Sequence, residues 1–216
     1  MPADAFGDGH GLRPDVRAFV LAKLGPGIGD MVWDVESGDG SVGIECARFG
    51  AAVVAVDRDY AACERVRQNV RLHGVKVAMA SGDVRSSAGH LPRPDAVFLG
   101  QGGPEAIRAC AALKPARIVA VAAPADAQAI LDILDEQGYR PDAVRLQATR
   151  LGPPEQPNPP EPSERSGDPV IIVWGERDAR PLVRRPSGTN RPIETISPPP
   201  GEPGIPTRLD VSHRKA

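Results

Sequence analysis

The chain has 216 residues, and its 26 lysine and arginine residues against 28 aspartate and glutamate residues give a formal net charge of −2. This length can bury one domain core with residues left over, and the near-neutral charge gives no sign of a nucleic-acid surface. The three cysteines and four histidines are too widely spaced for a zinc or disulfide framework, so we expect no metal and a reducing, cytoplasmic location. The apolar runs are of strand length, so we expect no membrane span.

The pattern of apolar residues predicts an α/β fold with a mostly parallel sheet. Residues 14–24 place Val16, Phe19, Val20 and Leu24 on one face, which indicates an amphipathic helix. Strands then alternate with helices, as in a parallel sheet covered on both faces. The predicted strands are 31–36, 51–57, 76–81, 95–100 and 117–123, and the predicted helices between them are 42–49, 60–73, 104–113 and 126–137.

Helix 60–73 carries the clearest boundary signals. Asp59 can cap its first turn, and Gly74 suits its C-terminal end. Between them, Ala62 and Val66 fall on one helical face.

The alternation ends after the fifth strand. Residues 143–149 and 169–175 both form strand-like runs with no helix between them, so we expect these last two strands to pair antiparallel. The proline-rich connector 151–168 would overhang the carboxyl edge of the sheet, either as a lid or as an uninvolved insertion. We expect a flexible N-terminus over 1–11, one domain over 12–178 and a disordered, proline-rich tail over 179–216.

Three successive strand ends carry residues suited to an adenosine ligand. Gly38 and Gly40 can present main-chain amides at the start of a helix. Asp57, about 20 residues on, can accept hydrogen bonds from both ribose hydroxyls. Asp83 can accept from the exocyclic amine of adenine, and the main chain of Val84 can read the ring edge. The alternative for each aspartate is a turn or capping role.

The letters of the glycine loop, G-D-G-S-V-G over 38–43, also match a dinucleotide-binding pattern. Asp34 and Glu36 would repel a pyrophosphate but tolerate the sulfonium and ammonium groups of S-adenosylmethionine. The acidic loop and the antiparallel last strand therefore favour S-adenosylmethionine.

Several segments together resemble one enzyme family, the precorrin C15-methyltransferases (decarboxylating) of cobalamin biosynthesis. That family also forms the C-terminal half of precorrin-6Y C5,15-methyltransferase. The resemblance extends over about residues 9–178. It is carried by PDVRAFVLAKLGPGIGDMVWDVESGDGSVGIECARFGAAVVAVDRD (14–59), CERVRQNVRLHGV (63–75), PDAVFLGQGGPEA (94–106), GYRPDAVRLQATRLGP (138–153) and PVIIVWGER (169–177).

This resemblance implies a class I, Rossmann-like methyltransferase fold with a seven-stranded sheet and S-adenosylmethionine as methyl donor. It implies methylation of a precorrin at C15 with decarboxylation of the ring C acetate. The relatives suggest a homo-oligomer, and the length leaves no room for a C5-methylating domain in this chain. The implied cofactor residues are Glu36, Ser37, Gly38, Asp39, Gly40, Asp57 and Val84, beside Asp83.

A precorrin carries many carboxylates, so its pocket should offer cations and main-chain donors. The candidates are the 100–103 loop, with Gly100, Gly102 and Gly103, and the arginines Arg13, Arg17 and Arg150. No general base is assigned, because the substrate brings its own reactivity and the protein mainly aligns the methyl group.

Three positions depart from the family pattern at the site. Glu36 and Gln101 stand where the family has glycine, and Leu12 stands where it has a threonine that contacts the cofactor. Two other functions therefore stay open. One is a diverged, weakly active or non-catalytic binding protein, and the other is a methyltransferase for another small molecule or nucleic acid.

Overall fold

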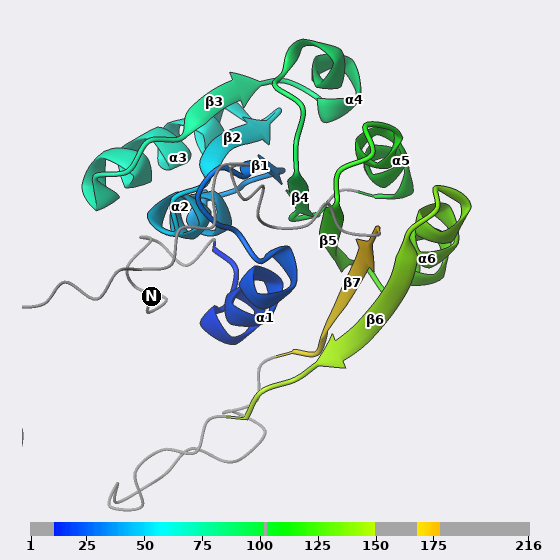
Figure 1. The fold of residues 1–216 in the computed structure, drawn as a ribbon. Coiled ribbons are helices and arrows are strands. Elements are labelled where there is room, and N and C mark those ends of the chain that lie inside the picture. Colours follow the sequence, from blue (N-terminus) through cyan, green and yellow to red (C-terminus); the bar gives the residue numbers. More distant parts are fainter. Residues whose placement is uncertain (1–10, 102, 150–167, 178–216) are drawn as a thin grey trace, which may run out of the picture. The chain divides into compact units, whose positions relative to one another are not determined.

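The computed structural model describes residues 11–101, 103–149 and 168–177, and within these ranges seven strands form one sheet in the order β3-β2-β1-β4-β5-β7-β6 (Figure 1). Neighbouring strands are parallel except at β7, which runs antiparallel to both β5 and β6. The strands are β1 (Met31–Val35), β2 (Ala52–Asp57), β3 (Ala78–Ser81), β4 (Ala96–Leu99), β5 (Arg117–Ala122), β6 (Arg140–Leu146) and β7 (Val170–Glu176). The predicted sheet, with its antiparallel last strand, is confirmed.

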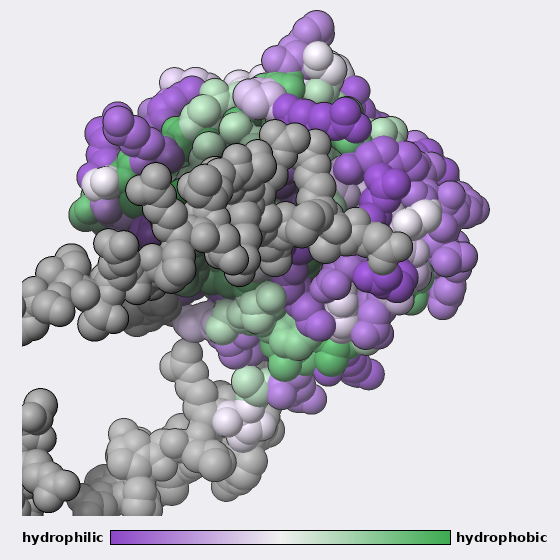
Figure 2. Space-filling model, viewed as in Figure 1, coloured by the Kyte–Doolittle hydropathy of each residue, from purple (hydrophilic) through white to green (hydrophobic). Residues whose placement is uncertain are grey.

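Helices cover both faces of the sheet (Figure 1). One face carries α1 (Pro14–Leu24), α2 (Ser41–Arg48) and α3 (Tyr60–His73), and the other carries α4 (Val84–Ser87), α5 (Pro104–Ala112) and α6 (Ala127–Glu136). Each face has its own buried apolar cluster. The outer surfaces of α5 and α6 are hydrophilic, as expected of helices that turn one stripe to a core (Figure 2).

Two of the three cysteines are packing residues in these clusters. Cys46 lies in the cluster beneath α1 and α2, and Cys110 lies in the cluster beneath α5 and α6. Burial raises the pKa of the Cys110 thiol to about 12, so this thiol stays protonated and unreactive.

One strand begins earlier than predicted, and two short helices were not predicted. Strand β6 begins at Arg140, three residues before the predicted start, and contains Pro141. A proline is tolerated there because β6 is an edge strand that pairs only with β7. The short helix α4 and the 3₁₀ helix η2 (Ala88–His90) were not predicted, since so few residues show no helical period.

The predicted flexible N-terminus, proline-rich connector and tail lie almost wholly outside the described residues, so those three interpretations stay predictions. Within the described ranges, no helix has both the length and the apolar character needed to cross a bilayer.

Candidate functional site

The predicted site residues lie at the carboxyl edge of the sheet, next to the point where the strand order reverses. Strand β1 has β2 on one side and β4 on the other, and the helices that follow β1 and β4 cover opposite faces. Such a reversal leaves a crevice above the strand ends, where α/β proteins bind ligands.

Residues 36–40 form a tight turn between β1 and α2. Glu36, Gly38 and Gly40 all adopt left-handed backbone conformations, with φ of 53°, 59° and 74°. Glycine reaches this region without steric cost, whereas a residue with a Cβ loses roughly 1–2 kcal/mol there. The glycine that the family pattern has at position 36 therefore has a conformational reason, and Glu36 occupies the position at a cost.

Asp57 connects this turn to β2. Its Oδ2 accepts a hydrogen bond from the Gly38 N–H at 3.1 Å, and its Oδ1 accepts one from the Asp59 N–H at 2.9 Å. The side chain is nearly buried, so it faces the turn and not bulk solvent. Each carboxylate oxygen can accept a second hydrogen bond, which leaves acceptor capacity for a ligand hydroxyl.

Buried polar atoms without partners gather around the same turn. Within the described part of the chain, Asp34 Oδ1, Ser37 Oγ and Asp39 Oδ2 are buried and make no hydrogen bond. Buried polar atoms are nearly always satisfied in proteins, so three exceptions in one turn point to a ligand or to ordered water. Ser37 and Asp39 belong to the predicted cofactor set. Asp34 lies outside the predicted cofactor set, although its charge was expected to favour a cationic ligand.

Asp34 is fully buried at the end of β1. Its Oδ2 accepts a hydrogen bond from the Gly43 N–H at 2.8 Å, and a Cβ on Gly43 would lie 2.7 Å from the same oxygen. Burial raises the pKa of Asp34 from 3.8 to about 8, the hydrogen bond from Gly43 opposes that rise, and the carboxylates of Asp39 and Asp57 add to it.

The side chain of Glu36 turns toward solvent and Arg58, whose Nη2 lies 3.5 Å from Glu36 Oε1. Both residues line a cavity of about 200 Å³, and Gln101 and Gly103 also line it. The structure thus places two of the three departures, Glu36 and Gln101, against one small cavity. The third, Leu12, packs against the apolar cluster beneath α1.

Asp83 caps α4, accepting from the Arg85 N–H at 2.9 Å, and it also pairs with the Arg85 guanidinium. Hydrogen bonds from the Arg85 side chain, followed by the one from its N–H, lower the pKa of Asp83 to about 2. The adenine role of Asp83 stays a prediction, and it requires Arg85 to share this carboxylate. Val84, the first residue of α4, is buried.

The candidate substrate residues are placed less uniformly. The Gly100 N–H donates to Val35 O at 2.9 Å, so Gly100 lies beside the end of β1. Gly103 precedes α5 at its N-cap. Gly102 and Arg150 lie outside the described residues.

Arg17 does not suit the substrate role considered for it. It is 2% exposed, and its Nε donates to Glu45 Oε1 at 2.7 Å while its Nη1 donates to Leu12 O at 2.7 Å. This buried pair joins α1 to α2, so the expectation for Arg17 was wrong. Arg13 remains partly exposed and pairs with Asp15.

A family model described as a precorrin methyltransferase domain matches residues 4–153. The chain belongs to this family. The resemblance inferred from the sequence is therefore confirmed.

Relatives and solved structures agree with this assignment. A precorrin-6Y C(5,15)-methyltransferase (decarboxylating) of Sinorhizobium sp is 34% identical over 156 residues, which cover 68% of this chain and 37% of the relative. The chain thus corresponds to little more than a third of that protein. The crystal structure of precorrin-6y C5,15-methyltransferase from Geobacter metallireducens GS-15 matches with a TM-score of 0.73 at 23% identity, over 82% of this chain and 97% of its own.

A further solved structure locates the likeness within the longer enzyme. The C-terminal domain of precorrin-6Y C5,15-methyltransferase from Rhodobacter capsulatus matches with a TM-score of 0.66 at 25% identity, over 82% of this chain and 96% of its own. These likenesses confirm the class I methyltransferase fold.

The raised pKa of Asp34 makes stability depend on pH. In the unfolded chain this carboxyl ionises near pH 4, whereas in the folded chain it stays protonated until about pH 8. The stability that protonated Asp34 contributes is complete below pH 4 and is lost as pH rises toward 8, by at most about 1.4 kcal/mol per pH unit. We expect Asp34→Asn to remove this loss, so that urea denaturation between pH 5 and 8 gives the variant a flatter profile. For Asp59→Asn, at an exposed carboxylate, the dependence of the unfolding free energy on pH should parallel that of the wild type. If the profile of Asp34→Asn also parallels that of the wild type, Asp34 does not cause the loss of stability.

The left-handed backbone at Glu36 predicts a gain on replacement. Glu36→Gly should raise the free energy of unfolding by about 1 kcal/mol, because the turn no longer holds a Cβ in a strained conformation. Glu36→Gln keeps that Cβ and removes only the charge, so its stability should stay within about 0.5 kcal/mol of the wild type. Chemical denaturation measures both values. Equal stability of the two variants would show that the backbone at position 36 is not strained.

Proposed function

We propose that this chain binds S-adenosylmethionine and transfers its methyl group to C15 of a precorrin, with loss of carbon dioxide from the ring C acetate. The observation that carries the proposal is the left-handed turn at 36–40, surrounded by buried carboxylates, in a member of the precorrin methyltransferase domain family. Only the C15 half of the relatives' reaction is proposed, since the Rhodobacter capsulatus likeness falls on a C-terminal domain. The proposal includes a cytoplasmic location, self-association and no nucleic-acid partner.

The residues present fit a cationic adenosyl donor. Gly38 and Gly40 let the main chain approach the donor closely, and the spare acceptor capacity of Asp57 suits its ribose hydroxyls. The unsatisfied oxygens of Ser37 and Asp39 are acceptors for an ammonium group. Asp83 and Val84 are proposed on the adenine side. When bound, the donor supplies an electrophilic methyl carbon on sulfur.

A dinucleotide fits the same turn less well. Its pyrophosphate would bring negative charge to a turn where Asp39 and Asp57 are nearly buried. Both carboxylates would repel a phosphate through a medium of low dielectric constant. The sign of the local charge thus favours the sulfonium compound.

The substrate is proposed to lie between the turn and the start of α5, where Gly100 and Gly103 are placed. The main-chain N–H group of Gly103 is a candidate donor to its carboxylates, as are Gly102 and Arg150, which lie outside the described residues. In the reaction, C15 forms a bond to the methyl carbon as the bond from that carbon to sulfur breaks. The bond between the methylene carbon and the carboxylate carbon of the ring C acetate then breaks. Carbon dioxide leaves, and the electron pair of that bond enters the protonated conjugated ring. The protein contributes alignment and exclusion of water.

A direct assay tests the activity. The full chain is incubated with a precorrin-6-type substrate and S-adenosylmethionine labelled in its methyl group. We expect labelled product and carbon dioxide in equal amounts, because both steps belong to one reaction. Donor binding in a titration without transfer of label would leave a binding protein with this fold, and absence of both would contradict the proposal altogether.

Replacing Asp57 tests the donor site independently of the substrate. Asp57→Asn should weaken the affinity for S-adenosylmethionine by about 1–3 kcal/mol, because a buried acceptor for the ribose hydroxyls becomes partly a donor. Asp59→Asn is the matched control, since asparagine caps a helix as well as aspartate and this side chain is exposed. Calorimetric titration measures both affinities, with unfolding curves to confirm that each variant is folded. Unchanged affinity in Asp57→Asn would remove Asp57 from the site.

A further inference from the structure

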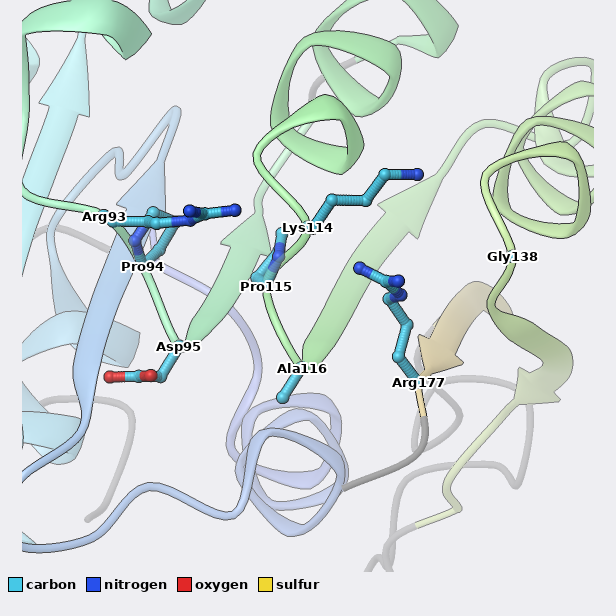
Figure 3. A pocket seen from close by; sticks show the side chains of 8 residues that line it. All are labelled: Arg93, Pro94, Asp95, Lys114, Pro115, Ala116, Gly138 and Arg177. Carbon is cyan, nitrogen blue, oxygen red and sulfur yellow. The ribbon is translucent and has the colours of Figure 1, made fainter. Parts of the chain in front are cut away.

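A second, larger cavity lies at the opposite edge of the sheet. It has a volume of about 680 Å³, within the range of small-molecule sites. Its walls come from the segments that enter β4 and β5 and from the ends of α6 and β7, so it is at the amino edge, away from the turn at 36–40 (Figures 1 and 3). The lining residues are Arg93, Pro94, Asp95, Lys114, Pro115, Ala116, Gly138 and Arg177.

Three cationic side chains line this cavity, with a single carboxylate among them. Figure 3 shows Arg93 and Arg177 extending toward the cavity from opposite sides, whereas Asp95 points away. Asp95 Oδ2 instead accepts a hydrogen bond from the Met31 N–H at 2.9 Å. The charge that faces the cavity is therefore predominantly positive.

These cations lack the carboxylate partners that other arginines have. In the described ranges, no carboxylate oxygen lies within 4.0 Å of a side-chain nitrogen of Arg93, Lys114 or Arg177. By contrast, such pairs are formed by arginines that include Arg13, Arg17, Arg58, Arg65, Arg67, Arg85, Arg108 and Arg117. Like charges around one cavity repel each other, and an anion bound between them would remove that repulsion.

Neutral contacts hold the three side chains in position. Lys114 Nζ donates to Gln137 O at 2.9 Å and to Gln137 Oε1 at 3.1 Å, and Arg93 Nε donates to Leu113 O at 3.1 Å. The guanidinium of Arg177 lies 5.5 Å from the centre of the Tyr139 ring. A guanidinium has five N–H donors and an ammonium three, so these contacts fix the side chains while leaving donors for a ligand. A site whose donors are already positioned loses less entropy on binding.

We propose that this cavity binds a small polyanion, a molecule with two or more phosphate or carboxylate groups. Phosphate and carboxylate groups both carry negatively charged acceptor oxygens, and guanidinium and ammonium groups donate hydrogen bonds to such oxygens. The cavity is at the other edge of the sheet from the proposed donor site, so the bound anion is neither the methyl donor nor its acceptor. The inference does not depend on the proposed methyl transfer.

Titration calorimetry on the full chain tests the site, with pyrophosphate as the phosphate probe and citrate as the carboxylate probe. We expect saturable binding of at least one probe at one site per chain, weakening as salt is raised. The preferred probe distinguishes a phosphate ligand from a carboxylate ligand. No saturable binding of either probe at low salt would overturn the proposal.

Matched variants assign the binding to this cavity. Arg93→Gln and Lys114→Gln should each weaken the preferred probe at least tenfold while leaving the affinity for S-adenosylmethionine unchanged. Arg93→Gln is the safer variant for folding, because Arg93 is exposed. Arg108→Gln, at an exposed arginine paired with Glu136, is the control and should bind the probe as the wild type does. Equal losses in all three variants, or displacement of the probe by S-adenosylmethionine, would place the anion elsewhere.

Discussion

The hydrogen bond from the Gly43 N–H to the buried carboxylate of Asp34 determines the geometry of the carboxyl edge. It holds the first turn of α2 against the end of β1, and the close approach leaves no room for a side chain on Gly43. With both ends fixed, residues 36–40 must reverse the chain direction within a few residues, which they do through three left-handed conformations. The unsatisfied oxygens of Ser37 and Asp39 lie in this constrained turn.

The same contact gives the site its electrostatic character. An ionised carboxylate without a partner is costly in the interior, and the neighbouring carboxylates of Asp39 and Asp57 increase that cost. Two changes relieve it, namely a proton on Asp34 or a positive charge close to the turn. A cationic ligand close to the turn would therefore lower this cost, and an anionic ligand would add to it. The buried acids thus act on ligand choice without needing to contact the ligand.

Local signals made some elements predictable. Helix α3 begins and ends where the sequence indicates, because Asp59 caps it through the Ala61 N–H and Gly74 adopts the left-handed conformation at its end. The turn after β1 was likewise recognisable from its glycines. By contrast, the early start of β6 depends on its place at the sheet edge, which no short stretch of sequence specifies.

Side-chain partners were harder to predict than elements. Asp57 and Asp83 look alike in the sequence, since each lies at or just after the end of a strand and before a helix. Asp57 turns back to the amide of Gly38, 19 residues away, whereas Asp83 pairs with Arg85 in its own helix. Arg17 was misjudged for a similar reason, because its partner Glu45 belongs to another helix. Such choices depend on tertiary contacts that the sequence pattern does not contain.

The parallel direction of the strands also places acidic and basic side chains at opposite edges of the sheet, although their charges nearly cancel in the net charge. A net charge of −2 suggests a surface without strong preference. Yet buried carboxylates gather at the carboxyl edge, while Arg93, Lys114 and Arg177, far apart in the sequence, meet at the amino edge. The electrostatic field at the surface depends on the positions of the charges and not only on their sum. A cavity with walls of low dielectric constant concentrates this field. Because a parallel sheet brings strand starts together at one edge and strand ends at the other, its topology can build two oppositely charged sites from a nearly neutral chain.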